Sequence, residues 1–223
     1  MATDDKFNHL STGSLRVTGR LVDASNATLY AVAELDGAAM VCIYKPIAGE
    51  RPLWDFPDGC LAHREFAAYI VSEQLGFNVV PLTVLRDGPY GQGMAQEWID
   101  IDESIDLAQF FSTDHPRLRA MALFDAIVNN TYRKIGHLLP VNNKVVYGCD
   151  HGVTFHTEDK LRTVLQSYPN VAAMIKLTAK ERYSTYVKQQ ENDIGVEFGE
   201  ELASGITRES LQTVSGDKYR NEI

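Results

Sequence analysis

Residues 125–156 read DAIVNNTYRKIGHLLPVNNKVVYGCDHGVTFH. The apolar run from Lys144 to Cys149 predicts a short buried strand that ends at Asp150. A polar loop precedes the strand, and in it Tyr132 is followed five positions later by His137. A polar loop, a short strand and a strand-end carboxylate therefore follow one another within one segment.

This order is typical of the catalytic half of ATP-dependent phosphotransferases. In kinases the loop supplies an aspartate, then a metal-binding Asn or a substitute, and the strand delivers a second aspartate that holds magnesium. Asp150 occupies the place of the second aspartate, and Tyr132 occupies the place of the first. A phenol, with an unperturbed pKa of about 10, cannot replace a carboxylate at neutral pH. The segment predicts kinase architecture with altered kinase chemistry.

Length and composition narrow the class of protein. The 223 residues suffice for one compact domain or two small lobes. A net charge of −9 argues against nucleic-acid partners, which need clustered Lys and Arg. The three cysteines form no CxxC pair, which indicates a reducing compartment. Without a signal pattern or an apolar run of ~18 residues, we expect a cytoplasmic protein with no membrane span.

The first half of the chain carries strand signals and one helix signal. Alternating apolar and polar residues predict strands, and Asp36-Gly37 is a hairpin signal between the second and third of them. The apolar stripe that follows the Pro-rich connection 46–60 has helical spacing. The expected elements are strands at 15–21, 29–35 and 40–44, a helix at 61–75, and strands at 79–85 and 94–99.

The second half changes to helical patterns, expected at 107–111, 116–129, 158–167 and 178–190. We predict an α+β, two-lobed protein-kinase-like fold, with a small antiparallel β N-lobe carrying one helix and a mainly helical C-lobe. Residues 1–12 are expected to be a flexible N-terminus, 13–99 the N-lobe and 100–223 the C-lobe.

Lys45 and Glu65 form a candidate pair for ATP binding. A lysine at the end of a strand can supply a point charge for the ATP phosphates, and a glutamate on the next helix can orient it. Taken alone, Lys45 is equally a surface lysine and Glu65 an exposed helix charge. Their order in the chain favours the pair.

The rest of the nucleotide site is predicted from two segments. The loop 23–28 contains no GxGxxG, so its phosphate contacts would come from backbone N–H groups and from Ser25, Asn26 and Thr28. A plain hairpin loop explains the same residues. The segment expected to connect the two lobes adds four further ATP-binding candidates, Gln96, Glu97, Trp98 and Ile99.

Asp150 is the candidate Mg²⁺ ligand, because this cation prefers hard oxygen donors. An ordinary strand-end aspartate is the alternative. His137 is the second metal candidate, although imidazole is a poor magnesium ligand and the ring could instead hydrogen-bond the loop. His151 and His156 are interpreted as structural, since DHGVTFH lacks the ligand spacing of a zinc site.

The loop around Tyr132 contains the remaining catalytic candidates. Arg133 and Lys134 could stabilise charge on a transferring phosphoryl group, beside Asn129 and Asn130. A solvated loop would show the same residues. Asp125 is interpreted as packing or capping behind this loop, and not as a replacement base.

With these residues in view, the chain resembles the phosphatidylinositol 3-/4-kinase-like family found mainly in actinobacteria, which is distantly similar to HipA-type kinases. The resemblance covers about residues 14–165. The catalytic loop of that family usually reads NNADRKGGH, so the chain departs from it at Thr131, Tyr132 and Ile135 and agrees at His137. The blocks that carry the resemblance are GRLVDASNATLYAV (19–32), VCIYKPIAGERPLWDFPDGCLAHREFAAYIVSEQLG (41–76), VVPLTVLRDGPYGQGMAQEWID (79–100), MALFDAIVNNTYRKIGHLLP (121–140) and VYGCDHGVTFHTEDKLRTVL (146–165).

The resemblance implies an ATP- and Mg²⁺-using kinase-like phosphotransferase, weakened or altered by Tyr132, and leaves the acceptor open among protein, lipid headgroup and small metabolite. The alternative is a catalytically inactive pseudokinase that serves as a regulatory or binding module. A third possibility is transfer of a nucleotidyl group from a reversed ATP.

Overall fold

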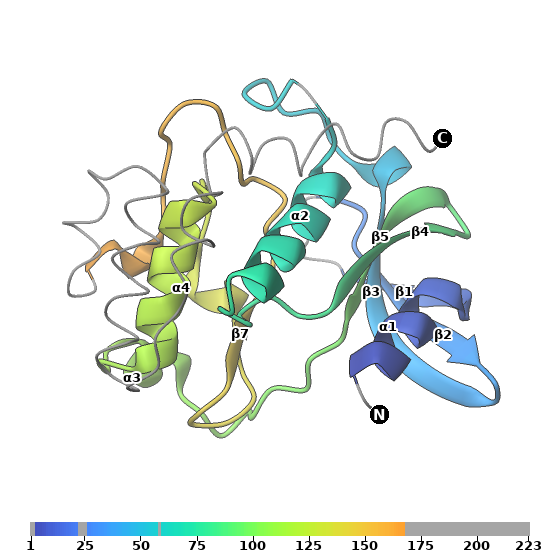
Figure 1. Cartoon of the computed structure of the whole chain (residues 1–223), viewed down its shortest axis with the longest axis horizontal. Helices are drawn as coiled ribbons and strands as arrows, with labels where there is room; N and C mark the ends of the chain where they lie inside the picture. Colours follow the sequence, from blue (N-terminus) through green and yellow to red (C-terminus); the bar gives the residue numbers. More distant parts are fainter. Residues whose placement is uncertain (1–2, 22–25, 58, 168–223) are drawn as a thin grey trace.

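The computed structural model describes residues 3–21, 26–57 and 59–167, and its first part is a five-stranded antiparallel sheet (Figure 1). The first three strands form the expected meander, with Leu35 paired to Ala38 across the turn. Asp36 and Gly37 both have positive φ, as a two-residue hairpin turn requires. The strands are β1 (Ser14–Arg20), β2 (Leu29–Leu35), β3 (Ala38–Pro46), β4 (Thr83–Gly88) and β5 (Gly91–Glu97), in the spatial order β1-β2-β3-β5-β4.

The hairpin of β4 and β5 lies several residues from its expected place. Gly88 pairs with Gly91, so only Pro89 and Tyr90 form the turn, and both strands extend into the turn region that the sequence predicted. Strand β5 also pairs with β3, which makes β3 a central strand and sets Lys45 opposite Met94.

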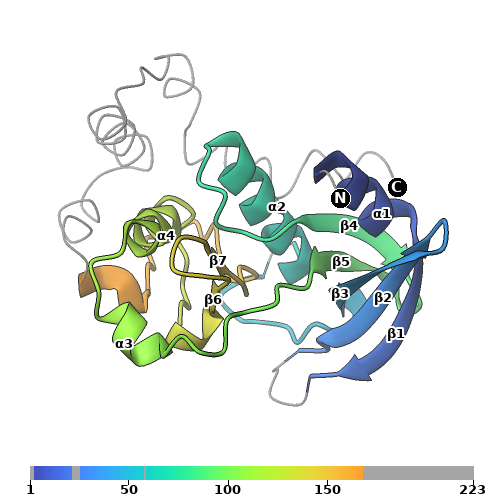
Figure 2. The same cartoon turned by 90° about the horizontal axis from the view of Figure 1, so that it is seen from below.

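Two helices cover the sheet where one was expected (Figure 2). Helix α2 (Leu61–Gln74) matches the prediction, but α1 (Thr3–Thr12) occupies residues expected to be flexible. Leu10 of α1 is fully buried, and the His9 ring bonds the Ala33 carbonyl at 2.9 Å. Arg86 donates to the carbonyl of Leu10, which fastens the end of the helix to β4. The expectation of flexibility is therefore wrong for residues 3–12.

The second part consists of helices α3 (Leu107–Phe111) and α4 (Pro116–Ile127) and a small hairpin, β6 (Leu138–Pro140) with β7 (Val146–Gly148). The short segments η1 (Ile47–Gly49), η2 (Ile135–His137) and η3 (Val164–Ser167) are 3₁₀-helical. The helix predicted at 158–167 is thus wrong apart from η3. Arg162 instead exchanges backbone hydrogen bonds with Asn130 and Arg133. The helix predicted at 178–190 lies outside the described residues.

Helix α2 lies between the sheet and α4 (Figure 1), and buried contacts join the two parts. The Phe77 and Phe124 rings lie 5.5 Å apart, and the Gly148 N–H donates to the Val79 carbonyl at 2.7 Å. The predicted α+β class is confirmed, with the elements in the order expected for a kinase-like fold. In the described part of the chain, every helix is too short or too polar to cross a membrane.

Candidate functional site

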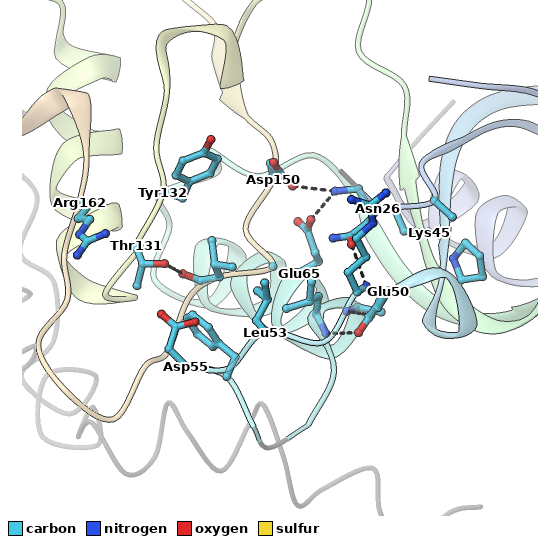
Figure 3. Close-up of a pocket in the computed structure, with 18 residues that line it drawn as sticks. Asn26, Lys45, Glu50, Leu53, Asp55, Glu65, Thr131, Tyr132, Asp150 and Arg162 are labelled. Atoms are coloured by element: carbon cyan, nitrogen blue, oxygen red, sulfur yellow. Dashed lines mark hydrogen bonds and ion pairs between the residues drawn. The ribbon is translucent and has the colours of Figure 1, made fainter. Parts of the chain in front are cut away.

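Three charged side chains meet where the sheet, α2 and the β7 loop come together (Figure 3). The Lys45 ammonium lies 2.6 Å from the Glu65 carboxylate and 3.0 Å from the Asp150 carboxylate. Lys45 is at the end of β3, Glu65 is on α2, and Asp150 follows β7. The Lys45 side chain is only 19% exposed, so it is not an ordinary surface lysine. The structure brings together the three residues that the sequence singled out.

Both charges of the Lys45–Asp150 pair are retained at neutral pH. Burial alone would lower the pKa of Lys45, but the carboxylates of Glu65 and Asp150 outweigh that effect and raise it. The Lys45 ammonium in turn lowers the pKa of Asp150, against the opposing effect of burial. Glu65 also accepts the His151 N–H at 2.8 Å, which fixes the carboxylate between the two parts of the chain.

The backbone at Asp150 is strained, with φ of 63° in the left-handed region that non-glycine residues rarely adopt. The Asp150 side chain is 49% exposed, whereas Glu65, the other carboxylate that binds Lys45, is 2% exposed. The carboxylate at the strand end can therefore reach a ligand while it keeps its contact with Lys45.

A cavity of about 380 Å³ opens beside this cluster, between the sheet, α2 and the loops of the second part. Its volume is within the usual range of small-molecule sites. Charged, polar and apolar residues line it together. They are Asn26, Ala27, Lys45, Pro46, Glu50, Arg51, Leu53, Asp55, Phe56, Leu61, Ala62, Glu65, Thr131, Tyr132, Asp150, Gly152, Val153 and Arg162.

The connection between β3 and α2 forms one wall of the cavity. Glu50 accepts the backbone N–H groups of Leu61 and Ala62 at 2.9 and 2.8 Å, so its carboxylate caps the N-terminus of α2. Asn26 accepts the Arg51 N–H at 3.0 Å, which ties this connection to the loop before β2. Asn26 lines the cavity as predicted.

Most of the predicted ATP-binding residues lie away from this cavity. Thr28 is buried and does not line it, and Ser25 lies outside the described residues. The crossing segment Gln96–Ile99 does not line it either: Gln96 donates to Thr83, Glu97 pairs with Lys6, and the Trp98 N–H donates to the Val41 carbonyl. Strand pairing and local bonds engage Gln96, Glu97 and Trp98, and the predicted role of the segment in ATP binding stays a prediction.

Tyr132, which the sequence comparison with kinases predicted to replace a catalytic aspartate, lines the cavity. Its ring is 49% exposed, and the Lys134 ammonium lies 4.3 Å from the ring centroid. The Tyr132 N–H donates to the Asn130 side chain, and the Thr131 hydroxyl donates to the Val153 carbonyl at 3.0 Å. Lys134 stacks on the tyrosine and is absent from the cavity lining, so its predicted contact with phosphate is not supported by this geometry.

Arg133 has a structural position, contrary to its prediction as a stabiliser of the phosphoryl group. Its guanidinium and the Asp125 carboxylate are both fully buried and lie 2.8 Å apart. The same guanidinium bonds the Cys149 carbonyl and the His151 ring. Asn130 also donates to Asp125, which agrees with the interpretation of Asp125 as a residue that packs behind the loop.

His137 lies beside Asp150, and its predicted role as a metal ligand stays a prediction. His137 Nε2 lies 3.6 Å from an Asp150 oxygen, while Nδ1 faces the Lys134 N–H at 3.4 Å. Burial lowers the pKa of His137, although Asp150 opposes the shift, so the ring is neutral near pH 7. His156 bonds the Asp55 carbonyl. Among the described residues no three His, Cys, Asp or Glu side chains gather as a ready-made metal site.

Sequence reasoning missed Glu50, Arg51, Asp55 and Arg162 as residues of the cavity. The first three lie in the Pro-rich connection, where no periodicity reports which way a side chain points. Arg162 lies in a segment that was expected to be helical. One signal was available for Glu50 alone. Carboxylates are common near helix N-termini, so Glu50 could have been expected to lie near the start of the predicted helix 61–75.

Comparison with known proteins finds one close curated relative and a remote structural likeness. Protein Rv2133c of Mycobacterium tuberculosis is 44% identical, over 73% of this chain and 71% of that protein. Among solved structures, a golgi casein kinase is similar with a TM-score of 0.48 and 12% identity, over 95% of this chain and 73% of that chain. No family model matches the chain.

Proposed function

We propose that this chain, which belongs to the family of the Mycobacterium tuberculosis protein Rv2133c, is an ATP- and Mg²⁺-dependent kinase-like phosphotransferase whose transfer is weakened or altered by Tyr132. The name of that relative states no activity. The observation that supports it best is Lys45 held between Glu65 and Asp150 beside an open cavity.

The Lys45–Glu65 pair suits the binding of a phosphate chain. A lysine that must contact phosphate needs a fixed position and a retained charge, and Glu65 supplies both. The ammonium lies at the cavity wall, which Asn26 and Ala27 of the loop before β2 also line. Backbone and amide groups of such a loop are suitable donors to phosphate oxygens.

The donor set fits Mg²⁺. Proteins bind this ion through one or two carboxylates together with phosphate oxygens and water, and do not need a complete cage of side chains. Asp150 would hold the ion through its exposed carboxylate, with His137 beside it as a hydrogen-bond partner or weak ligand. Bound Mg²⁺ would supply charge neutralisation for the phosphates.

Tyr132 is the reason to expect weak or altered transfer. Positioning and electrostatics supply most of the catalysis in phosphoryl transfer, so loss of the base reduces the rate without abolishing it. The cost of a missing general base is on the order of 10²–10⁴-fold. We expect Tyr132→Asp to raise the turnover of ATP.

Calorimetric titration of the chain with ATP and MgCl₂ tests the proposal. Lys45→Met should abolish binding, whereas Lys144→Met, which removes an exposed lysine from the turn between β6 and β7, should leave binding unchanged. Equal binding by the native chain and the Lys45 variant would contradict the proposal.

The pseudokinase alternative is favoured by one observation, the Tyr132 ring stacked under Lys134 where a base would stand. Such a module would bind ATP without turning it over. A phosphate-release assay on the native chain separates the two functions, because the module predicts ATP binding with no release above the protein-free rate.

A further inference from the structure

Four carboxylates line the cavity, and three of them are already engaged by the protein. Glu50 caps α2 through two backbone N–H groups. Glu65 bonds Lys45 and the His151 N–H, and Asp150 bonds Lys45. Asp55 is the exception: within residues 3–21, 26–57 and 59–167, its carboxylate has no hydrogen-bond or ion-pair partner. It is the one lining carboxylate with both oxygens available to a ligand.

The backbone of Asp55 is nevertheless held in place. The His156 ring bonds the Asp55 carbonyl at 2.8 Å, and the His156 carbonyl accepts from the Asn129 side chain at 2.9 Å. The neighbouring Phe56 ring lies 5.0 Å from the His156 ring and 4.9 Å from the Arg64 guanidinium. This chain of contacts fastens Asp55 to the catalytic-type loop, which begins at Asn129. A free carboxylate on an anchored backbone is what a proton acceptor requires.

Asp55 also lies on the appropriate side of the cavity. Figure 3 shows its carboxylate toward the wall formed by Thr131 and Arg162, with the Lys45–Asp150 contact at the other end of the cavity. The Tyr132 hydroxyl points away from Asp55 in this view. An acceptor bound between the two ends would therefore meet Asp55 and not the phenol.

We propose that Asp55 is the general base of phosphoryl transfer and replaces the aspartate that Tyr132 has displaced. This inference rests on the proposed function. The acceptor O–H gives its proton to Asp55 while its oxygen forms a bond to the γ-phosphorus of ATP. The bond from that phosphorus to the β,γ-bridging oxygen breaks, and ADP leaves with the electron pair. Arg162 faces the same wall and supplies positive charge near the transferred group.

The test is ATP hydrolysis by the full chain, with water as the acceptor. The rate is measured from the release of phosphate. Asp55→Asn should lower kcat on the order of 10²–10⁴-fold and leave ATP affinity unchanged. Asp36→Asn is the matched control, because Asp36 is an exposed turn residue with positive φ that Asn tolerates.

A second variant distinguishes loss of the general base from disruption of the structure of the site. If Asp55 is the base, Tyr132→Asp should raise kcat far more in the Asp55→Asn background than in the native chain, because the restored aspartate supplies the missing acceptor. Equal gains in the two backgrounds, unchanged kcat in Asp55→Asn, or parallel loss of ATP binding and turnover would each overturn the assignment. A native chain that binds ATP without turnover also overturns it, while leaving ATP binding intact. That result, like failure to bind ATP, would also contradict the proposed phosphotransferase, whereas turnover that Asp55→Asn leaves unchanged overturns only the role of Asp55.

Discussion

The guanidinium of Arg133 binds the carboxylate of Asp125 at 2.8 Å, with both side chains completely excluded from solvent. Asp125 is on α4, and Arg133 lies in the loop between α4 and η2. The same carboxylate accepts the Thr163 hydroxyl at 2.8 Å and the Asn130 amide at 2.9 Å. One buried acid therefore anchors both the loop before η2 and the segment before η3.

Asp125→Asn should be strongly destabilising, because it leaves the Arg133 charge buried without its partner. Loss of one member of a buried ion pair costs about 3–5 kcal/mol. Asp114→Asn is the control, since it removes an exposed partner from Arg119 and should cost less than about 1 kcal/mol. Urea denaturation followed by circular dichroism measures both changes in the free energy of unfolding. Equal losses in the two variants would contradict a special role for the buried pair.

Gly93 of β5 sets the position of Lys45. A Cβ atom at residue 93 would lie 2.4 Å from the Lys45 carbonyl oxygen and 2.7 Å from the Pro46 Cα, so the two strands would have to separate. Gly93→Ala should cost about 1–3 kcal/mol of stability and weaken ATP binding.

The matched control is Gly19→Ala in β1, where the new Cβ would meet its nearest neighbour, Tyr30, at an ordinary 3.8 Å. Thermal unfolding and ATP titration of both variants compare the two positions. If Gly93→Ala behaves like Gly19→Ala in both measurements, close strand approach does not position Lys45.

Part of this site was predictable because its signals are local. The alternating residues and the Asp36-Gly37 turn predicted the meander, and the order of Lys45, Glu65 and Asp150 along the chain predicted a cluster that the structure brings together. These inferences need only periodicity, turn chemistry and a known order of elements.

Other parts depend on side-chain direction, which the sequence does not report. Arg133 and Lys134 are adjacent in a polar loop, yet one is buried on Asp125 and the other lies over Tyr132. Helix α1 has weak local signals and is held by tertiary contacts of Leu10 and His9. Asp55 enters the cavity only because its Pro-rich connection folds back against His156. Contacts between distant segments decide all these placements.

His151 should make the chain sensitive to mild acid. Burial, with the nearby Arg133 charge, holds the pKa of His151 well below its usual value, and the ring is fully buried. In the unfolded chain the histidine has a pKa of about 6.5 and binds a proton that the buried ring of the folded chain does not bind. This contribution to stability is complete above about pH 6.5 and is lost as the pH falls, at about 1.4 kcal/mol per pH unit.

Urea denaturation between pH 7 and pH 5, with a chelator present, should show a smaller slope of stability against pH in His151→Gln than in the native chain. Identical slopes would show that another group takes up the proton.

Asp150→Asn should separate metal binding from nucleotide binding. The amide keeps the shape of the side chain but removes the charge that Mg²⁺ requires, and Lys45 retains Glu65 as its partner. We therefore expect ATP affinity to become independent of MgCl₂ concentration in the variant, while binding of ATP without metal persists or strengthens because Asp150 no longer repels the phosphates.

Titrations with ATP at several MgCl₂ concentrations measure this, with Asp36→Asn as the isosteric control. An undiminished Mg²⁺ dependence in Asp150→Asn would place the metal on other ligands, and would leave the Lys45–Asp150 contact as an architectural ion pair.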